Sequence, residues 1–285
     1  MATRRRHTTR DTDSERAFSF LRLNERDRKP RTRGLTEIRG PYYTPMGKRY
    51  LEDVLETMGE YVDTLKFACG SFSLMPRRPL QEIIDVCHAH EVLVSTGGFV
   101  EHVLTRGKEA VARYLDECKR FGFDIVEVSS GFITLPADDL LRLTEQAQKA
   151  GLKVKAEVGI QFGAGGATSA EELEAAGTSD PDWAIQRARR HLEAGASMIM
   201  VESEGITENV RTRRTDVIAR FIRELGTEKL MFEAADPEVF GWYVKNYGPE
   251  VNLFVDHSQI VQLEALHSGI WGTQSLWGRV LTYKP

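Results

Sequence analysis

Cysteine is scarce in this chain of 285 residues, which has only Cys69, Cys87 and Cys118. An odd number of thiols at spacings unlike those of metal sites excludes a disulfide framework and is typical of reduced thiols in a cytoplasmic protein. Long apolar runs are missing too, since none approaches the ~20 residues that a helix needs to cross a bilayer. No apolar segment follows the basic N-terminus, so we expect neither a secretory signal nor membrane association.

A strong charge of either sign is also absent, because the formal net charge is -4 although 28% of the residues are charged. A mildly acidic balance gives no reason to expect nucleic acid as a partner. With 41% hydrophobic residues the composition is that of an ordinary globular protein, with enough length for a full core. The chain therefore fits one large domain or two small ones.

Residues 1–33 differ from the rest and are predicted to form a partly disordered basic extension before a domain over residues 34–285. The segment up to about Ser14 is polar and charged. We interpret the basic cluster Arg26–Arg33 as a solvated tail, with binding of an anion or RNA as the alternative. A short helix that docks on the main body or on a neighbouring subunit is expected around Phe18, Phe20, Leu21 and Leu23.

From Gly34 onward, short apolar runs alternate with helical patterns. The predicted strands are Gly34–Gly40, Val62–Gly70, Val92–Phe99, Asp124–Phe132, Lys153–Gln161, Ser197–Gly205, Lys229–Ala235 and Val251–Asp256. The predicted helices are Lys48–Met58, Pro79–His90, Lys108–Phe121, Ala137–Ala150, Pro181–Ala194, Asp216–Leu225, Pro237–Tyr247 and Gln259–Leu266. Strict alternation predicts a parallel sheet, and eight such units predict a (β/α)8 TIM barrel. A doubly wound open sheet would need a glycine-rich phosphate loop after its first strand, which this chain lacks.

The stretch Ser197–Gly205 (SMIMVESEG) shows the pattern most clearly. A nearly unbroken apolar run suits a strand that is buried on both faces. Glu202 and Glu204 follow where such a strand would emerge, and at strand spacing they point the same way. Paired acids at this end of a parallel strand can hold a divalent metal or move protons. The alternative is that they pair with nearby Arg or Lys, or are solvated.

Charged and small polar residues recur at the ends of the other predicted strands. They are Glu37, Arg39, Lys66, Ser95, Thr96, Gly97, Gly98, Glu101, His102, Glu127, Ser129, Ser130, Lys155, Glu157, Gln161, Glu233, Asp256 and His257. Each has a structural interpretation, as an ion-pair partner, a tight turn or a helix cap. Together they are more informative, because charges in or beside apolar runs are costly unless they are paired or bound to a metal.

A compensated cluster of Lys and Glu at the barrel mouth would suit a small, strongly anionic substrate held through a divalent cation. We favour Mg²⁺, because the candidate ligands are oxygens and no Cys/His set is present. The small residues Ser95–Gly98 would offer backbone N–H groups to an anion. The glycine run Gly163–Gly166 is predicted to be a lid or a phosphate-contacting loop.

An ordered series of short motifs resembles the phosphosulfolactate synthase family. The motifs are LKFACGS, STGGFVEH, FDIVEVSSGF, AEVG, MIMVESEG, MFEA, YGPEVNLF and LEALHSGIWG, and the similarity runs from about Arg33 to Val280. The resemblance implies a (β/α)8 barrel that adds sulfite to phosphoenolpyruvate with Mg²⁺, the first step of one route to coenzyme M. TEIRGPYY and SLMPR look more like a plant heat-stress-associated branch that shares the fold.

Residue by residue, the resemblance carries the family's motif positions to Lys66, Gly97, Gly98, Glu127, Glu157, Glu202 and Glu233. The chain departs from the family pattern after AEVG, where Ile160 and Gln161 replace two lysines. The family's arginine after the sixth strand is also missing, although Arg211 lies shortly downstream. Glutamine cannot protonate a carbanion as lysine can, so Lys155, His102 or His257 would have to supply the proton.

We therefore predict a lyase of this type that acts on a phosphoenolpyruvate-like anion and forms a homo-oligomer. The predicted catalytic residues are Lys66, Lys155, Glu127, Gln161 and His257. The predicted substrate- or phosphate-binding residues are Arg39, Ser95, Thr96, Gly97, Gly98, Ser129 and Arg211. The predicted metal ligands are Glu157, Glu202, Glu204 and Glu233. The alternatives are a barrel enzyme with another phosphorylated or enolic substrate, and a non-catalytic stress-associated relative.

Overall fold

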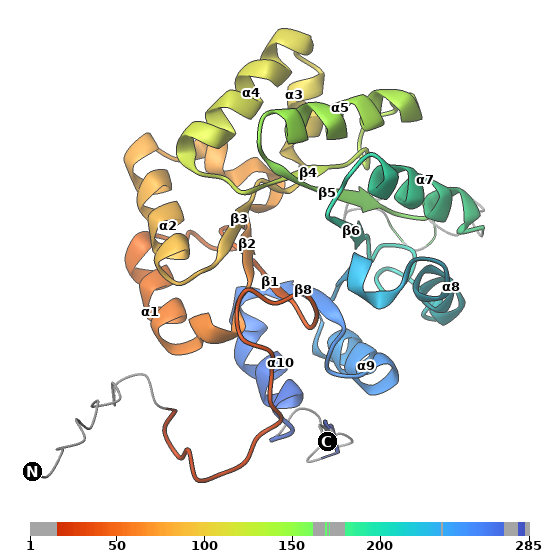
Figure 1. Cartoon of the computed structure of the whole chain (residues 1–285). Helices are drawn as coiled ribbons and strands as arrows, with labels where there is room; N and C mark the ends of the chain where they lie inside the picture. The colour runs from red at the N-terminus through yellow and green to blue at the C-terminus, as the bar shows by residue number, and fades with distance from the viewer. Residues whose placement is uncertain are drawn as a thin grey trace, which may run out of the picture.

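Eight parallel strands close into a barrel in the computed structural model, which describes residues 16–161, 169, 171, 180–234, 236–270 and 279–282 (Figure 1). The strands are β1 (Thr36–Arg39), β2 (Thr64–Lys66), β3 (Leu93–Ser95), β4 (Ile125–Val128), β5 (Lys153–Val158), β6 (Met198–Val201), β7 (Leu230–Glu233) and β8 (Asn252–Asp256). Each strand pairs with the next in the sequence, and β8 closes onto β1 with Glu37 opposite Phe254. The predicted (β/α)8 fold is confirmed.

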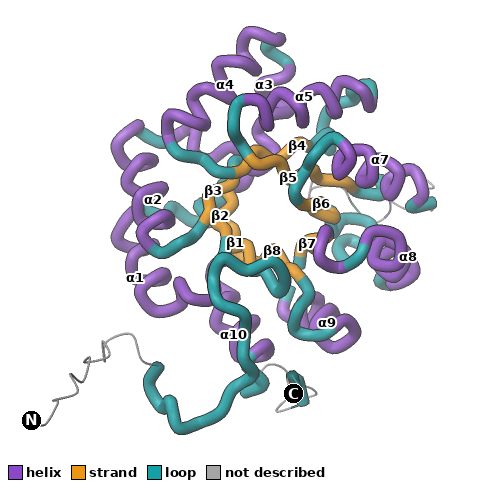
Figure 2. Tube along the Cα trace, in the orientation of Figure 1, coloured by secondary structure: helices purple, strands orange, loops and turns teal. Residues whose placement is uncertain are grey.

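Helices form an outer ring around these strands (Figure 2). They are α1 (Lys48–Met58), α2 (Arg77–Ala89), α3 (Val100–Leu104), α4 (Lys108–Phe121), α5 (Ala137–Lys149), α7 (Asp182–Glu193), α8 (Thr215–Leu225), α9 (Pro237–Tyr247) and α10 (Ile260–His267). Short 3₁₀ turns are η2 (Gly59–Tyr61), η3 (Ala68–Leu74), η4 (Gly97–Phe99), η5 (Thr227–Lys229) and η6 (His257–Gln259). The ranges of α1, α4 and α9 coincide with the predicted ones, whereas α3, which continues η4, was not predicted.

Burial of the strands on both sides explains their apolar runs. The main core lies between strands and helices, where Ile199 and Leu253 are fully buried. Inside the barrel, Met200, Met231 and Phe254 form a small separate cluster. The barrel interior is thus only partly apolar, and charged residues occupy the rest of it.

The basic segment before β1 is bound to the barrel. Arg26 pairs with Glu264 of α10 at 2.5 Å, and Arg31, which is 8% exposed, lies 3.6 Å from Asp63. The ammonium of Lys29 donates to two backbone carbonyls at 2.7 and 2.9 Å. The prediction of a solvated tail is therefore wrong for these three cations, because each compensates carboxylates or carbonyl groups on the barrel. The domain boundary at residue 33 stays a prediction.

The apolar residues near the start of the described chain do not dock on the barrel as expected. Phe18 and Phe20 are 70% and 78% exposed, and the residues around them form a turn instead of a helix. Their contact with a neighbouring subunit stays a prediction. Within the described part of the chain, every helix is too short or too polar to span a bilayer.

Candidate active site

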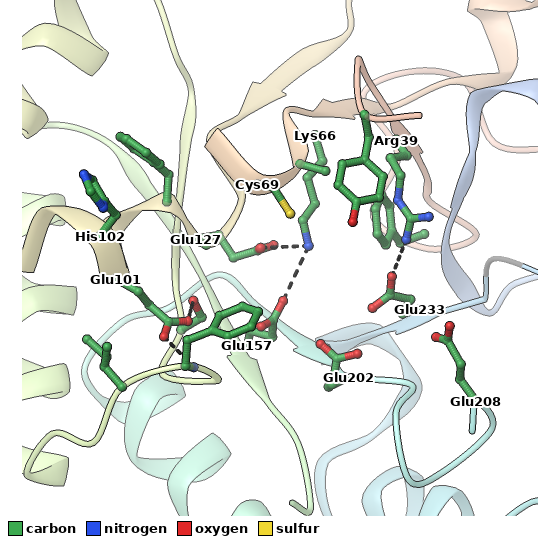
Figure 3. A pocket seen from close by; sticks show the side chains of 18 of the residues that line it. Arg39, Lys66, Cys69, Glu101, His102, Glu127, Glu157, Glu202, Glu208 and Glu233 are labelled. Atoms are coloured by element: carbon green, nitrogen blue, oxygen red, sulfur yellow. Dashed lines mark hydrogen bonds and ion pairs between the residues drawn. The ribbon is translucent and has the colours of Figure 1, made fainter. Parts of the chain in front are cut away.

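A cavity of about 500 Å³ opens where the strands end at their carboxyl termini (Figure 3). Its charged lining residues are Arg39, Lys66, Glu101, Glu127, Glu157, Glu202, Glu208 and Glu233. They come from β1, β2, β4, β5 and β7 and from segments after β3 and β6, far apart in the sequence. Parallel closure brings them together because all eight strands end at the same face.

A chain of ion pairs runs from the barrel interior to this cavity. Glu127 is fully buried, and its two carboxylate oxygens lie 2.7 Å from Lys66 and 2.9 Å from Lys155. Lys155 also pairs with Glu37 of β1, and Lys66 reaches Glu157 at 3.5 Å. The ammonium of Lys66 lies 4.5 Å from the centre of the Phe254 ring. Each charged residue in this series of ion pairs therefore has an oppositely charged partner, as the sequence pattern required.

Glu127 is a permanent anion in this arrangement. Burial pushes the pKa of its carboxyl up, but the ammonium groups of Lys155 and Lys66 outweigh burial and hold the pKa at about 2. Burial also works against the charge of Lys66, yet Glu127 and Glu157 raise the pKa of Lys66 well above its ordinary value. Glu127 thus serves as the fixed counter-charge of two lysines, and Lys66 presents a stable cation to the cavity.

Three acids that line the cavity, Glu157, Glu202 and Glu233, repel one another. Burial and the negative charge of Glu127 raise the pKa of Glu157 to about 8, although Lys66 opposes the change. Burial, followed by Glu233 and Glu157, raises the pKa of Glu202 well above its ordinary value. Glu233 accepts a 2.5 Å hydrogen bond from Arg39. Carboxylates forced together in this way favour a bound cation or a retained proton.

The part of the cavity that is lined by Glu157, Glu202 and Glu233 suits a divalent cation of the magnesium type. Nowhere in the described residues do three or more His, Cys, Asp or Glu side chains already form a metal-binding group. Mg²⁺ commonly uses only one or two protein carboxylates and completes its shell with water and substrate oxygens. Glu202 and Glu233 fit that requirement, because the charge of Glu233 lies close enough to raise the pKa of the buried Glu202. Glu157 differs from them because it faces Lys66.

The loop after β6 does not continue the strand direction. The acids of this loop that reach the cavity therefore differ from the predicted ones. β6 ends at Val201, so Glu202 and Glu204 lose the alternation expected of them. Glu204 is fully buried, accepts from Asn209 at 3.2 Å and is not among the described residues that line the cavity. Glu208 lines it instead and accepts from Ser203 at 2.7 Å. No sequence pattern singled out Glu208, because the turn of this loop places it.

Four other predicted residues lie elsewhere. Lys155 is 2% exposed beneath Glu127, and the His257 ring bonds through Nδ1 to the Arg39 carbonyl at 3.0 Å. Gln161 packs against Gly205, and Arg211 is exposed on the loop after β6. Among the described residues, the cavity lining includes none of these four. Lys155 and His257 support the site from behind, and the predicted lid Gly163–Gly166 lies outside the described residues.

The small residues after β3 mostly pack instead of facing the cavity. Ser95 and Thr96 are fully buried, and the Thr96 hydroxyl accepts from the Glu127 backbone N–H at 3.3 Å. Gly97 has a positive φ of 60°, and a Cβ there would lie 2.5 Å from the Phe67 carbonyl oxygen. Within the described chain only Gly98 of this run lines the cavity. The run therefore mainly shapes the wall of the cavity, and its role in anion binding stays a prediction.

Ser129 lines the cavity but is engaged by a neighbouring acid. Its hydroxyl donates to Glu101 at 2.5 Å, and the backbone N–H groups of Gly131 and Phe132 donate to the same carboxylate at 3.0 and 2.8 Å. Glu101 is 5% exposed, so its charge is compensated by these three donors. It therefore fixes the loop after β4 against α3, a role that spacing in the sequence does not reveal.

Comparisons with known proteins agree with this architecture. The family model described as (2R)-phospho-3-sulfolactate synthase (ComA) matches residues 24–273. Protein HEAT-STRESS-ASSOCIATED 32 of Arabidopsis thaliana is 39% identical, with 87% of this chain and 90% of that protein covered. The phosphosulfolactate synthase of Methanothermobacter thermautotrophicus is 27% identical, with 90% and 96% covered.

Solved structures share the fold at low identity. The carboxyl transferase domain of Rhizobium etli pyruvate carboxylase with oxalate has a TM-score of 0.54 and 12% identity, covering 79% of this chain and 40% of that one. A putative fructose-1,6-biphosphate aldolase of Coccidioides immitis has a TM-score of 0.52 and 13% identity, covering 81% and 79%. These likenesses show the barrel alone. The match of the family model over most of the barrel, by contrast, shows that the chain belongs to the (2R)-phospho-3-sulfolactate synthase (ComA) family.

Proposed function

We propose that the chain adds sulfite to phosphoenolpyruvate with Mg²⁺, giving 2-phospho-3-sulfolactate. The observation that carries this proposal is a single cavity in which Lys66 and Arg39 face the acids Glu157, Glu202 and Glu233. A trianionic phosphoenolpyruvate and a dianionic sulfite could not approach such an acidic wall without a cation between them. Membership of the family supports the same reaction.

Substrate binding would use both kinds of charge. Glu202 and Glu233 would hold Mg²⁺, which supplies positive charge for the carboxylate of the substrate as electrons move onto it. Lys66 would neutralise the substrate carboxylate or phosphate as a fixed cation. Arg39 contacts Glu233 at 2.5 Å and the Tyr43 hydroxyl at 3.0 Å. Its guanidinium could release Glu233 and bind a substrate phosphate instead.

The bond changes then need one proton. The sulfur lone pair of sulfite forms a bond to C3, the electron pair of the C2–C3 double bond moves toward C2 and the carboxylate, and C2 takes up a proton. Of Lys155, His102 and His257, only His102 is among the described residues that line the cavity. Glu157 also lines it, and with a pKa of about 8 it keeps its proton at neutral pH. We assign proton delivery to Glu157, with Glu202 and Glu233 left for the metal.

A direct assay tests this function. The purified protein is incubated with phosphoenolpyruvate, sulfite and Mg²⁺, and ³¹P NMR should show a new phosphate ester signal that disappears with EDTA. Glu202→Gln should abolish the signal, whereas Glu145→Gln, on the exposed side of α5, should leave it unchanged. If no new signal forms with the unmodified chain, this pair of substrates is rejected.

A second candidate keeps the site and changes the reaction. The replacement of the two family lysines by Ile160 and Gln161, and the similarity to Protein HEAT-STRESS-ASSOCIATED 32, favour another phosphorylated or enolic acid. Thermal shift measurements with several phosphorylated three-carbon acids, each with and without Mg²⁺, would identify that ligand. Failure of every ligand to stabilise the protein with Mg²⁺ would favour a non-catalytic role.

A further inference from the structure

The cavity has an ionic side and an aromatic side. In Figure 3, Glu202, Glu233 and Glu208 lie together on one side, near Arg39, whereas His102 lies on the other. The rings of Tyr42, Tyr43 and Phe254 lie against the Arg39 guanidinium, and the other aromatic and apolar lining includes Phe99, His102, Phe132 and Ile133. The proposed reaction uses only the ionic side, so the aromatic side has no assigned role.

The size of the cavity also exceeds what a three-carbon acid needs. A phosphorylated three-carbon acid occupies on the order of 200 Å³, if each non-hydrogen atom takes somewhat less than the ~30 Å³ share of a water molecule. The cavity holds about 500 Å³. Sulfite and a magnesium ion with its remaining water would take up on the order of 150 Å³ more at the same share per atom, which leaves room for one group of roughly the size of an aromatic ring.

The aromatic side is held in place by buried interactions. Glu101 is 5% exposed and accepts from the Phe132 backbone N–H at 2.8 Å, so the loop that carries Phe132 is fixed. The Phe132 side chain itself is 68% exposed at the rim. Elsewhere in the lining of the same cavity, the rings of Phe99 and His102 stack with centroids 5.4 Å apart and planes at 27°. A fixed loop that presents a bare ring to a cavity is a preorganised surface for another flat group.

We propose that Phe99, His102 and Phe132 form a second subsite, which binds a planar apolar substituent on an enol or 2-oxo acid whose anionic end lies at Lys66 and Arg39. The substrate class then also includes C3-substituted acids larger than phosphoenolpyruvate. This inference rests on the proposed function for the anionic end alone. Binding of the planar substituent would cover the exposed ring of Phe132 and remove that ring from water.

Paired ligands test the subsite. With Mg²⁺ present, phenylpyruvate should bind about tenfold more tightly than pyruvate in isothermal titration calorimetry. Tenfold corresponds to ~1.4 kcal/mol, which partial burial of one ring can supply. Phe132→Ala should remove most of that ratio without changing the affinity for pyruvate. Phe20→Ala, which truncates a phenylalanine that is 78% exposed away from the cavity, is the matched control and should keep the ratio.

The outcomes separate the two proposals. Equal affinities for the two acids, or a ratio that survives Phe132→Ala, would overturn the subsite while the sulfite reaction could still be observed by ³¹P NMR. Binding of phenylpyruvate without any reaction of phosphoenolpyruvate and sulfite would support the subsite and reject the proposed reaction. If neither acid binds, the subsite proposal fails, and the sulfite reaction is decided by the ³¹P NMR assay alone.

Discussion

Replacement of Glu127 by glutamine tests the ion-pair chain that supports the site. Glu127 is fully buried between Lys66 at 2.7 Å and Lys155 at 2.9 Å. Glutamine has nearly the same shape but no charge, and its amide would point N–H donors or a weaker acceptor at two ammonium groups. The variant therefore removes one carboxylate partner from each lysine without creating a cavity, and leaves Lys155 with Glu37 and Lys66 with Glu157.

The magnitude follows from the pKa of the carboxyl. A pKa of about 2 in the folded protein, against an ordinary 4.5, means that folding favours the ionised form. At 1.36 kcal/mol per pKa unit, ionisation of Glu127 contributes about 3 kcal/mol to the free energy of unfolding at neutral pH. Since the folded pKa is depressed, this contribution is present above pH 4.5 and is lost as the pH falls toward 2. For a chain of this size the variant should unfold ~10 °C lower at pH 7.

Thermal unfolding followed by circular dichroism at several pH values provides the measurement. Glu145→Gln is the matched control, because Glu145 lies 4.0 Å from Lys149 with both side chains largely exposed. Such a surface pair contributes little, so the control should shift the Tm by less than ~2 °C. A Glu127→Gln variant as stable as this control at pH 7 would refute the reasoning, as would a Tm difference that persists unchanged at pH 3.

Three further predictions concern the cavity. Glu202→Gln should raise the Tm of the metal-free protein and abolish stabilisation by Mg²⁺ in thermal shift assays; because burial and Glu233 raise the pKa of this acid, the gain should grow as the pH rises above 4.5. Product formation should fall as the pH rises and Glu157 loses its proton, at or below about 8 because Mg²⁺ at Glu202 and Glu233 favours the ionised carboxyl, and Glu157→Gln should remove this limb of the pH–rate profile together with most activity. Gly98→Ala should lower the Tm by several degrees, since a Cβ there would lie 2.6 Å from the Ser129 hydroxyl, and adding Ser129→Ala should restore part of the loss.

Local patterns predicted the elements of the barrel well for identifiable reasons. Runs such as Met198–Val201 are apolar on both faces because helices cover one side of the strand and the barrel interior the other. α4 ends at Gly122, whose φ of 91° few other residues adopt, so its end was visible in the sequence. α3 was missed because its five residues follow η4 directly, without a separate start signal.

The candidate site was predicted only in part. Lys66, Glu157, Glu202 and Glu233 line one cavity because strand ends are adjacent in a closed barrel. Residues beyond the strands were harder to place, since loop turns, not alternation, direct their side chains. Glu204 is an example, because it follows the end of β6 and is not among the described residues that line the cavity.

The order of apolar runs and glycine-ended helices in the sequence by itself determined the eight-fold barrel, because strand burial and helix ends are local properties of the chain. The motifs also pointed to Lys66, Glu157, Glu202 and Glu233, which line one cavity. Only the tertiary structure decided which of these side chains is a fixed charge and which one can hold a proton. Glu127 is a fixed anion because it lies between two ammonium groups, whereas Glu157 has a pKa of about 8 because it is buried and lies near the acids Glu127 and Glu233. Proton affinity depends on distances between strands, and those distances arise only when the barrel closes.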